Sequence, residues 1–374
     1  MDLVNGSLRI ALLATARYPI AEPFTGGLAA HVATLARGLA ARGHAVTVFA
    51  PPGTDAGPRV AVRAFGGPES ALDFSAAARG DVSMLAPPFM AEHHAYQRLM
   101  LELTQDCPFD VVHNHGFHYL PIAMAPAVRA ASVTTFHAPP TPWQESAVAC
   151  LALGEGPAFL TVSETNRRAW ASRVPSVRAV RNGIDLSAWP VAGDARASGH
   201  AVWTGRMVPE KGPHLAVEAA HAAGFSVRLA GPTPDADYLH REVLPRLGAD
   251  DELVGHVTQA ELGALYGTSA VALSTPRWEE PFGLTTVEAL ACGVPVAAFD
   301  RGAMRELLCP RSGRLATPDD AWALGGAALD AAALDPADCR ARAEAVASVD
   351  AMLDGTLAVY AEALAQHGRL PAAA

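Results

Sequence analysis

A chain of 374 residues is long enough for two domains, each with its own hydrophobic core. Its net charge of −10, without a basic cluster or a basic amphipathic helix, argues against nucleic acid and anionic membranes as partners. The apolar runs have only the length of strands, so we expect no membrane span. The N-terminus lacks a basic leader, so we expect no signal peptide. The five cysteines are scattered without a C-x-x-C pair, which is typical of a cytoplasmic protein.

Strands alternate with a helix at the start of the chain. Apolar segments 9–14 and 45–50 predict strands, and the segment 28–41 between them predicts a helix with one apolar face. Short apolar runs predict further strands at 110–113, 132–136, 159–163 and 177–180. Residues 51–109 show poor periodicity apart from a helix at about 91–103, and we interpret them as the variable, acceptor-facing region.

A second alternating series follows the polar, glycine-bearing segment 191–199, which we interpret as a linker. Strands are predicted at 201–204, 226–230, 253–257, 270–274 and 294–299, with helices between them and a last helix at 351–366. Both halves therefore predict parallel α/β sheets. Ligands of such sheets bind at the carboxyl ends of the strands, so we expect one cleft between the two domains.

Residues 278–295, WEEPFGLTTVEALACGVP, combine an acidic loop with the start of a helix. Glu280 lies in the loop before Gly283, and Glu288 lies just over one turn inside the helix. The free amide groups of a helix start suit a phosphate, and two carboxylates can accept hydrogen bonds from the vicinal hydroxyls of a sugar. This segment taken alone leaves a second interpretation open, a buried helix with an incidental acid in its first turns.

Two cations lie in the loop 205–212, between a predicted strand and the next helix. Lys211 is the only lysine among 28 basic residues, which indicates that a compact ammonium is needed there. Together with Arg206 it predicts a clamp for a diphosphate, and a solvated basic pair is the alternative. Gly26 and Gly27 precede the helix at 28–41, where they predict either a close backbone approach to a phosphate or sugar, or a plain turn.

Histidines follow two of the predicted strands. His137 is followed by Ala-Pro-Pro, which ends its strand and leaves the imidazole free to bond a sugar hydroxyl or a developing charge; a histidine bonded to backbone at the core edge is the alternative. Because side chains alternate along a strand, we expect His113 and His115 to point to opposite faces. This disfavours a zinc site, and His115 is the one expected to reach the cleft.

These segments together resemble the retaining GT-B glycosyltransferases of family 4. The glycine pair, VVHNH, TTFH, VSE, NGID, TGRMVPEKG and EPFGLTTVEALACGVPV follow the family's order, and Glu280 and Glu288 form its E-x7-E motif. The resemblance implies two Rossmann-like domains facing a central cleft. Residues 1–190 would bind the acceptor, residues 191–350 the nucleotide-sugar donor, and the last helix, about 351–370, would cross back to the first domain.

The resemblance also implies roles for individual residues. Arg206 and Lys211 would bind the donor diphosphate, Glu288 the ribose hydroxyls and Glu280 the donor sugar. His137 would lie near the anomeric carbon, and no metal ion is expected because the two cations and the helix dipole supply the positive charge. The other expected donor-binding residues are Gly26 and Gly27, facing the phosphates, and Phe282, Gly283, Leu284 and Thr285, at the start of the helix.

The activity implied by the resemblance is transfer of a sugar from a UDP- or GDP-sugar to an acceptor hydroxyl, with retention of anomeric configuration. Without a basic amphipathic helix, the expected acceptor is a small soluble polyol, aminocyclitol, sugar or natural-product aglycone, and no stable membrane association is expected. Two alternatives stay open. One is a sugar-nucleotide epimerase on the same fold, and the other is a non-catalytic subunit that binds a nucleotide sugar.

Overall fold

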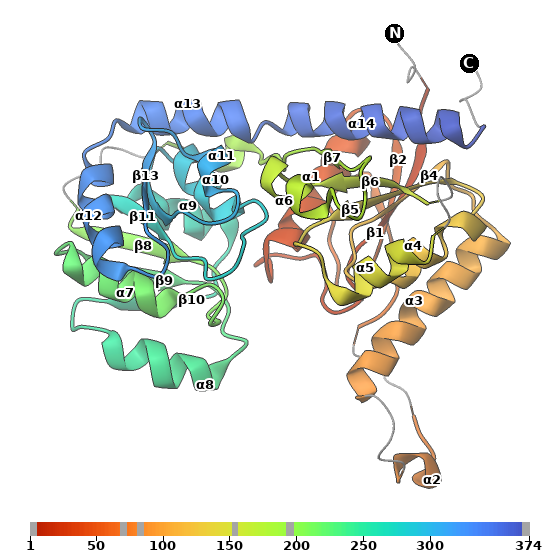
Figure 1. Ribbon diagram of the computed structural model, residues 1–374, viewed down its shortest axis with the longest axis horizontal. Coiled ribbons are helices and arrows are strands. Elements are labelled where there is room, and N and C mark those ends of the chain that lie inside the picture. The colour runs from red at the N-terminus through yellow and green to blue at the C-terminus, as the bar shows by residue number, and fades with distance from the viewer. Residues whose placement is uncertain (1–5, 68–72, 81–85, 152–155, 192–197, 369–374) are drawn as a thin grey trace.

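The computed structural model describes residues 6–67, 73–80, 86–151, 156–191 and 198–368. These residues form two parallel sheets flanked by helices, side by side along the longest axis of the molecule (Figure 1). The first sheet has the order β3-β2-β1-β4-β5-β6-β7 and the second β10-β9-β8-β11-β12-β13. Both place their first strand beside the fourth, so each sheet has a switch point where the strand order reverses, the place where doubly wound sheets bind ligands.

The strands are short and mostly buried. In the first sheet they are β1 (Arg9–Leu13), β2 (Ala45–Ala50), β3 (Val60–Ala64), β4 (Val111–Asn114), β5 (Ala131–Phe136), β6 (Ala158–Thr161) and β7 (Arg178–Ala179). In the second sheet they are β8 (His200–Thr204), β9 (Ser226–Ala230), β10 (Glu252–Gly255), β11 (Val271–Ser274), β12 (Val296–Phe299) and β13 (Gly313–Ala316).

Helices connect the strands on both sides of each sheet. Those of the first half are α1 (Gly27–Ala41), α2 (Ala76–Arg79), α3 (Pro87–Gln105), α4 (Leu120–Ala123), α5 (Pro142–Ala149) and α6 (Glu164–Trp170). The second half has α7 (Pro213–Ala222), α8 (Ala236–Tyr238), α9 (Gln259–Gly267), α10 (Leu284–Ala291), α11 (Met304–Leu307), α12 (Ala321–Ala332), α13 (Pro336–Val346) and α14 (Val349–Gln366). Among the described residues, none of the helices is both long and apolar enough to cross a bilayer.

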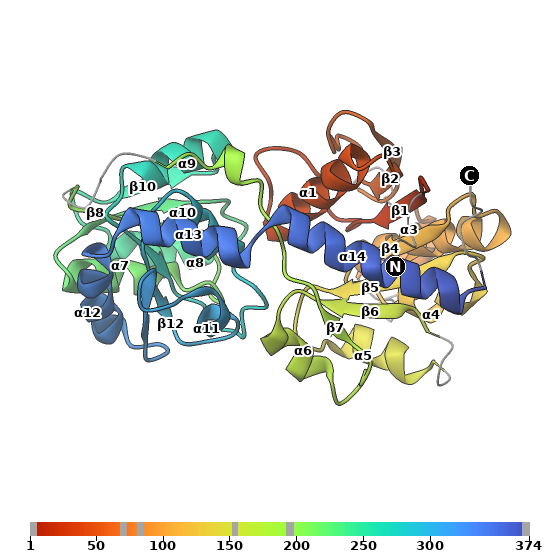
Figure 2. The same cartoon turned by 90° about the horizontal axis from the view of Figure 1, so that it is seen from above.

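The chain crosses between the two sheets at two neighbouring places. Ile184, on the way out of the first sheet, donates its backbone N–H to the carbonyl of Ala347 at 3.0 Å. Helices α13 and α14 meet at this point and run almost end to end over both halves (Figures 1 and 2). Met352, Leu353 and Tyr360 of α14 are buried in the core of the first sheet, so the predicted return of the last helix is confirmed.

Most predicted elements agree with the structure to within a few residues, and the predicted GT-B architecture is confirmed. Two strands, β3 and β13, were not predicted, and α3 begins at Pro87, several residues before the expected position. The predicted linker at 191–199 lies largely outside the described residues. The first sheet ends with β7 at Ala179 and the second begins with β8 at His200, and the boundary drawn at residue 190 stays a prediction.

Candidate active site

A cleft of about 610 Å³ opens between the two sheets. Its walls are the loops that follow β1 and β5 on one side and β8, β9 and β11 on the other, so it lies at the carboxyl ends of the strands. This volume is in the usual range for a small-molecule site. The cleft brings together these residues expected to bind the donor or take part in catalysis: Gly26, Gly27, His137, Arg206, Lys211, Glu280, Phe282, Gly283, Leu284, Thr285 and Glu288.

Close backbone packing holds the loop that carries the two cations. Gly212 begins α7 with a φ of 65°, and a Cβ there would lie 2.5 Å from the carbonyl oxygen of Thr275. A Cβ on Gly231 would lie only 1.9 Å from the carbonyl oxygen of Gly205. The Thr275 hydroxyl also lies 2.9 Å from the carbonyl oxygens of both Lys211 and Gly212. The backbone around Lys211 is therefore tied to the loop after β11.

The ammonium of Lys211 is paired with an acid of the E-x7-E motif. Its Nζ lies 2.5 Å from Oε2 of Glu280, and the indole N–H of Trp278 donates to the same oxygen at 3.0 Å. The ammonium also lies 5.1 Å from the centre of the Trp278 ring. Among the described residues, the ionic partner of Arg206 is the half-exposed Glu210, at 3.3 Å. Lys211 is thus held by a shorter contact than Arg206, whose guanidinium donates to Glu210 at 3.3 Å.

The start of α10 faces the cleft because a glycine makes the turn before it. Gly283 has a φ of 100°, and a Cβ there would lie 2.4 Å from the Cε atom of Met304. Leu284 and Thr285 line the cleft at the first turn of the helix, where backbone N–H groups have no partner within the helix. An anion in the cleft would therefore find hydrogen-bond donors and the positive end of the helix dipole there.

The three acids of residues 278–295 have different surroundings. Glu288 is buried in α10 at the cleft wall, and burial raises the pKa of its carboxyl to about 7. Glu279 is exposed and accepts the backbone N–H of Gly302 at 2.9 Å, so it holds the loop. Glu280 and Glu288, the acids of the E-x7-E motif, both line the cleft.

His137 lines the cleft at the end of β5 and sits on a group of buried histidines. Its Nε2 lies 3.0 Å from Nδ1 of His115. Burial, with His31 and His113 nearby, holds the pKa of the His137 imidazole well below its usual value, so the ring is neutral at pH 7. A neutral imidazole can form hydrogen bonds without bringing positive charge into the cleft.

Two expectations about the neighbouring histidines were wrong. The side chain of His115 is almost wholly buried, and it is not among the residues that line the cleft. The rings of His113 and His115 have centres only 4.0 Å apart, because residues two positions apart along an extended chain share a face. His113 lies between the Tyr360 hydroxyl and the Thr135 hydroxyl, each at 2.7 Å, which ties α14 to the first sheet.

The structure adds cleft residues that the sequence reasoning missed. Arg17 and Tyr18 follow β1, at the switch point of the first sheet, and burial raises the pKa of the Tyr18 hydroxyl. Asn182 is 5% exposed, and its Oδ1 has no hydrogen-bond partner in the part of the chain that the structure describes. The loop after a first strand is a recognised ligand position in doubly wound sheets, so that rule could have drawn attention to Arg17 and Tyr18.

The two halves of the chain contact each other at several points near the cleft. Leu284 lies against Gly27, where a Cβ would come within 2.9 Å of its Cδ1 atom. His256 Nε2 lies 2.9 Å from the carbonyl oxygen of Phe24. On the side of α6, the Glu306 carboxylate of α11 accepts the backbone N–H groups of Glu164 and Thr165, at 3.0 and 2.5 Å.

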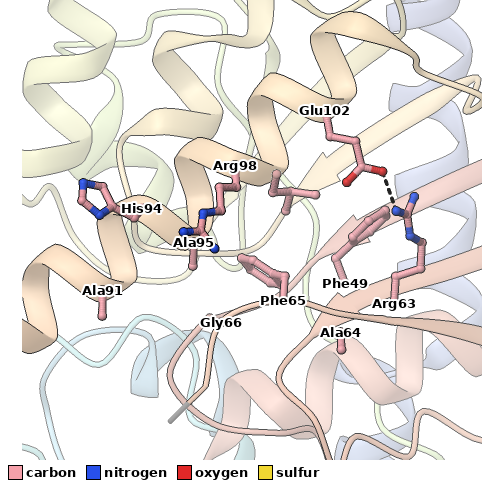
Figure 3. A pocket seen from close by; sticks show the side chains of 11 residues that line it. Phe49, Arg63, Ala64, Phe65, Gly66, Ala91, His94, Ala95, Arg98 and Glu102 are labelled. Atoms are coloured by element: carbon pink, nitrogen blue, oxygen red, sulfur yellow. Dashed lines mark hydrogen bonds and ion pairs between the residues drawn. The ribbon is translucent and has the colours of Figure 1, made fainter. Parts of the chain in front are cut away.

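A smaller cavity of about 240 Å³ lies within the first half of the chain, between β2, β3 and α3 (Figure 3). Its charged lining includes Arg63, which pairs with Glu102, and Arg98 (Figure 3). None of the residues expected to bind the donor lines it, so the predicted chemistry belongs to the cleft between the sheets.

Each half of the chain matches the model of a known protein family. Residues 25–188 match the model described as Glycosyltransferase Family 4, and residues 200–346 match Glycosyl transferases group 1. A glycogen synthase of Mycobacterium tuberculosis is 29% identical over 360 residues, covering 86% of this chain and 85% of the relative. A D-inositol 3-phosphate glycosyltransferase of Mycolicibacterium paratuberculosis is 27% identical over 353 residues, covering 80% and 76%.

Solved structures show the same fold at low sequence identity. Sucrose-phosphate synthase from Thermosynechococcus elongatus superposes with a TM-score of 0.74 at 20% identity, over 96% of this chain and 99% of that one. Anabaena Alr3699/HepE, solved with UDP and glucose, superposes with a TM-score of 0.71 at 17% identity, over 94% and 98%.

The two parallel sheets and the cleft between them define a GT-B glycosyltransferase. Within that class the chain belongs to family 4, whose members are retaining enzymes that transfer a sugar from a nucleotide-sugar donor.

Proposed function

We propose that the cleft transfers a sugar from a UDP- or GDP-sugar to a hydroxyl of a small soluble acceptor. The observation that carries this proposal is the convergence on one cleft of Arg206, Lys211, Glu280, Glu288 and the start of α10. Two cations and free helix amides suit a diphosphate, and two carboxylates suit the hydroxyls of a ribose and a sugar.

The pairing of Lys211 with Glu280 suggests how the donor is held. The ammonium has three N–H donors and uses one on the carboxylate at 2.5 Å, which leaves others for the phosphate oxygens. Glu280 can keep its hold on Lys211 through Oε2 and accept a sugar hydroxyl through its second oxygen. Arg206, loosely held by Glu210, would turn to complete the clamp.

In the transfer, the bond between the anomeric carbon and the phosphate oxygen breaks as the acceptor oxygen bonds to the same face. The acceptor proton passes to the leaving phosphate oxygen. Negative charge therefore builds on the diphosphate, where Lys211, Arg206 and the helix dipole would stabilise it. Preorganised hydrogen-bond donors and cations lower a barrier most where charge develops in this way. Neutral His137 would bond a hydroxyl of the sugar as the anomeric centre becomes cationic.

The nature of the acceptor is the least constrained part of this proposal. The relatives named above act on glycogen and on inositol phosphate, according to their names, and both acceptors are polyhydroxylated. The sequence pattern predicts no basic amphipathic helix for anionic lipid, so we favour a soluble polyol, aminocyclitol, sugar or natural-product aglycone.

A donor screen tests the proposal. Thermal shift with UDP, GDP and their sugars should show stabilisation by one nucleotide family, and mass analysis with candidate polyols should then show a glycosylated product. A new sugar nucleotide formed from donor alone would instead support the epimerase alternative. Binding of a donor without turnover on any acceptor would favour the non-catalytic subunit.

A further inference from the structure

Three histidines from separate elements converge beneath the cleft; His31 and His115 are buried, and His137 is partly exposed. His31 comes from α1, His115 follows β4 and His137 follows β5. One ring nitrogen of each lies within 4.8 Å of the corresponding nitrogens of the other two. In the part of the chain that the structure describes, they are the one group of at least three histidine, cysteine or acidic side chains with this spacing.

The spacing of the rings matches coordination of a single ion. The ring centres form a nearly regular triangle with sides of 5.0 Å (His31 to His137), 5.2 Å (His115 to His137) and 5.4 Å (His31 to His115). With zinc–nitrogen bonds of about 2.0–2.1 Å and ring centres roughly 1.1 Å beyond the nitrogen, three imidazoles around a tetrahedral ion have centres about 5.2 Å apart.

The hydrogen bonding of the triangle is incomplete without a further group. Nδ1 of His31 is buried and has no hydrogen-bond partner among the described residues. A buried polar atom without a partner is costly because it has given up its bonds to water, so such atoms mark a missing partner. The contact of 3.0 Å between His115 and His137 can hold one proton or lie along one edge of a metal site.

The protonation of the three rings also suits a metal. Burial lowers the pKa of His31 to about 4, and holds the pKa values of His115 and His137 well below their usual value. The rings are therefore neutral at pH 7, and a cation need displace no protons to bind them. Each ring keeps one N–H, so His115 or His137 would only exchange its tautomer.

We propose that His31, His115 and His137 form a binding site for a late transition-metal ion such as Zn²⁺, and that its occupation inhibits sugar transfer. Three imidazoles select such ions over Mg²⁺ or Ca²⁺, which prefer oxygen ligands. His137 also lines the cleft, and water can supply a fourth ligand. The bound ion is regulatory and takes no part in the transfer chemistry, although His137 belongs to both sites.

Inhibition follows from the position of His137 and rests on the proposed function. A metal ion would take one nitrogen of the imidazole and place a double positive charge behind the ring. Positive charge close to an anomeric carbon that is becoming cationic raises the barrier, because the interaction is stronger in the transition state than in the ground state.

Cobalt binding tests the site without any assay of transfer. Titration of the wild-type protein with Co²⁺ should give one bound ion per chain with the visible spectrum of a tetrahedral nitrogen site, displaced by Zn²⁺. His31→Leu and His115→Leu should each weaken binding at least tenfold. His221→Ala is the matched control, because the exposed His221 lies 2.7 Å from Asp251 and is a typical place for adventitious binding.

Several results would overturn the site. They are a wild-type protein that binds no stoichiometric Co²⁺, binding that survives in His31→Leu, and binding that disappears in His221→Ala. Circular dichroism checks the fold of each variant, and His31→Gln replaces His31→Leu if the latter does not fold.

Zinc inhibition is measured separately once an acceptor is known. Zn²⁺ at the concentration that saturates the site should abolish transfer, a chelator should restore it, and the residual transfer of His31→Leu should resist zinc. Stoichiometric binding with undiminished transfer would overturn the inhibitory role and contradict the position given to His137, while leaving the metal site in place. Failure of every donor to react would count against the proposed function and not against the cobalt result.

Discussion

At the scale of single residues, Glu288 shows how burial sets the chemistry of the cleft. Its carboxyl is buried within α10, where the charged form loses its hydration, and its pKa rises to about 7. The carboxyl is therefore divided between its two forms near neutral pH. The ionised form is the stronger acceptor for the hydroxyls of a ribose. Binding of a donor ribose to Glu288 should therefore favour loss of the carboxyl proton.

Glu288→Gln should change the pH dependence of donor binding. In the wild type, donor affinity should rise as the pH increases through about 7, because the carboxylate replaces the acid. The variant should bind the donor more weakly at pH 8 and with a flat profile from pH 6 to 8. Calorimetric titration with the donor measures this, and Glu279→Gln, which alters an exposed acid of the same loop, should keep the wild-type slope.

The same pKa shift predicts an effect on stability. The unfolded carboxyl ionises near its ordinary pKa of 4.5 and the folded one near 7, so its contribution favours folding below pH 4.5 and is lost as the pH rises through 7. The Glu288→Gln substitution removes this charge, so it should raise the free energy of unfolding at pH 8 by up to about 3 kcal/mol. At pH 4.5 the same substitution should change the free energy of unfolding little. A variant that is no more stable than the wild type at pH 8 would contradict the buried charge.

At the scale of elements, the glycines at the two ends of α7 separate backbone strain from packing. Gly212 before the helix and Gly224 after it both have positive φ, of 65° and 76°. A Cβ at Gly224 meets nothing within 4 Å, whereas a Cβ at Gly212 meets the carbonyl oxygen of Thr275 at 2.5 Å. Only the Gly212 end carries Lys211.

Gly224→Ala should lower the free energy of unfolding by about 1–2 kcal/mol, the cost of left-handed backbone for a residue with a Cβ. Gly212→Ala should lower it further and also weaken donor binding, because the loop must move away from Thr275. Denaturant unfolding and nucleotide titration on both variants check this. Equal effects of the two substitutions on nucleotide affinity would contradict the part given to loop 205–212.

Sequence patterns predicted buried strands well and exposed or very short strands poorly. β8 and β9 are apolar and bounded by glycines, and they appear where expected. β3 carries exposed residues along most of its length at the edge of the sheet, and β13 has four residues beginning with a glycine, so neither gives a period-two signal.

Some residues of the candidate site can be predicted from the local sequence, whereas others reach it only through the packing of the fold. A charged residue type close to a predicted strand end or helix start was enough to single out four of them: Glu280, Glu288, Arg206 and Lys211. His31 does not, because it lies on the buried face of α1 among apolar residues, and only the fold brings it to His115.

At the scale of the whole molecule, the cleft depends on contacts between the two halves. Glu306 of α11 reaches across to the start of α6, where its carboxylate accepts two backbone N–H groups and lies 3.7 Å from Arg181. The side chain is largely buried, and hydrogen bonds to a charged acceptor contribute about 1.5–3 kcal/mol each. This contact stabilises the arrangement in which both walls face the cleft.

Glu306→Ala should therefore loosen the closed arrangement without disturbing either sheet. We expect a donor KM at least tenfold higher and a larger radius of gyration in solution scattering of the ligand-free protein. Glu344→Ala is the control, because Glu344 pairs with Arg340 on the same helix, α13. Unchanged KM and scattering in Glu306→Ala would show that this contact does not hold the cleft together.

The most direct measurement for the account as a whole is calorimetric titration of UDP and GDP into wild type, Lys211→Ala and Arg206→Ala. If the diphosphate lies between these cations and the start of α10, one nucleotide binds at one site per chain. Each substitution then weakens binding by about 2–4 kcal/mol, or about 30- to 1,000-fold. The exposed Arg241→Ala should leave the affinity unchanged. Equal affinity in the wild type and in both cleft variants would contradict the account.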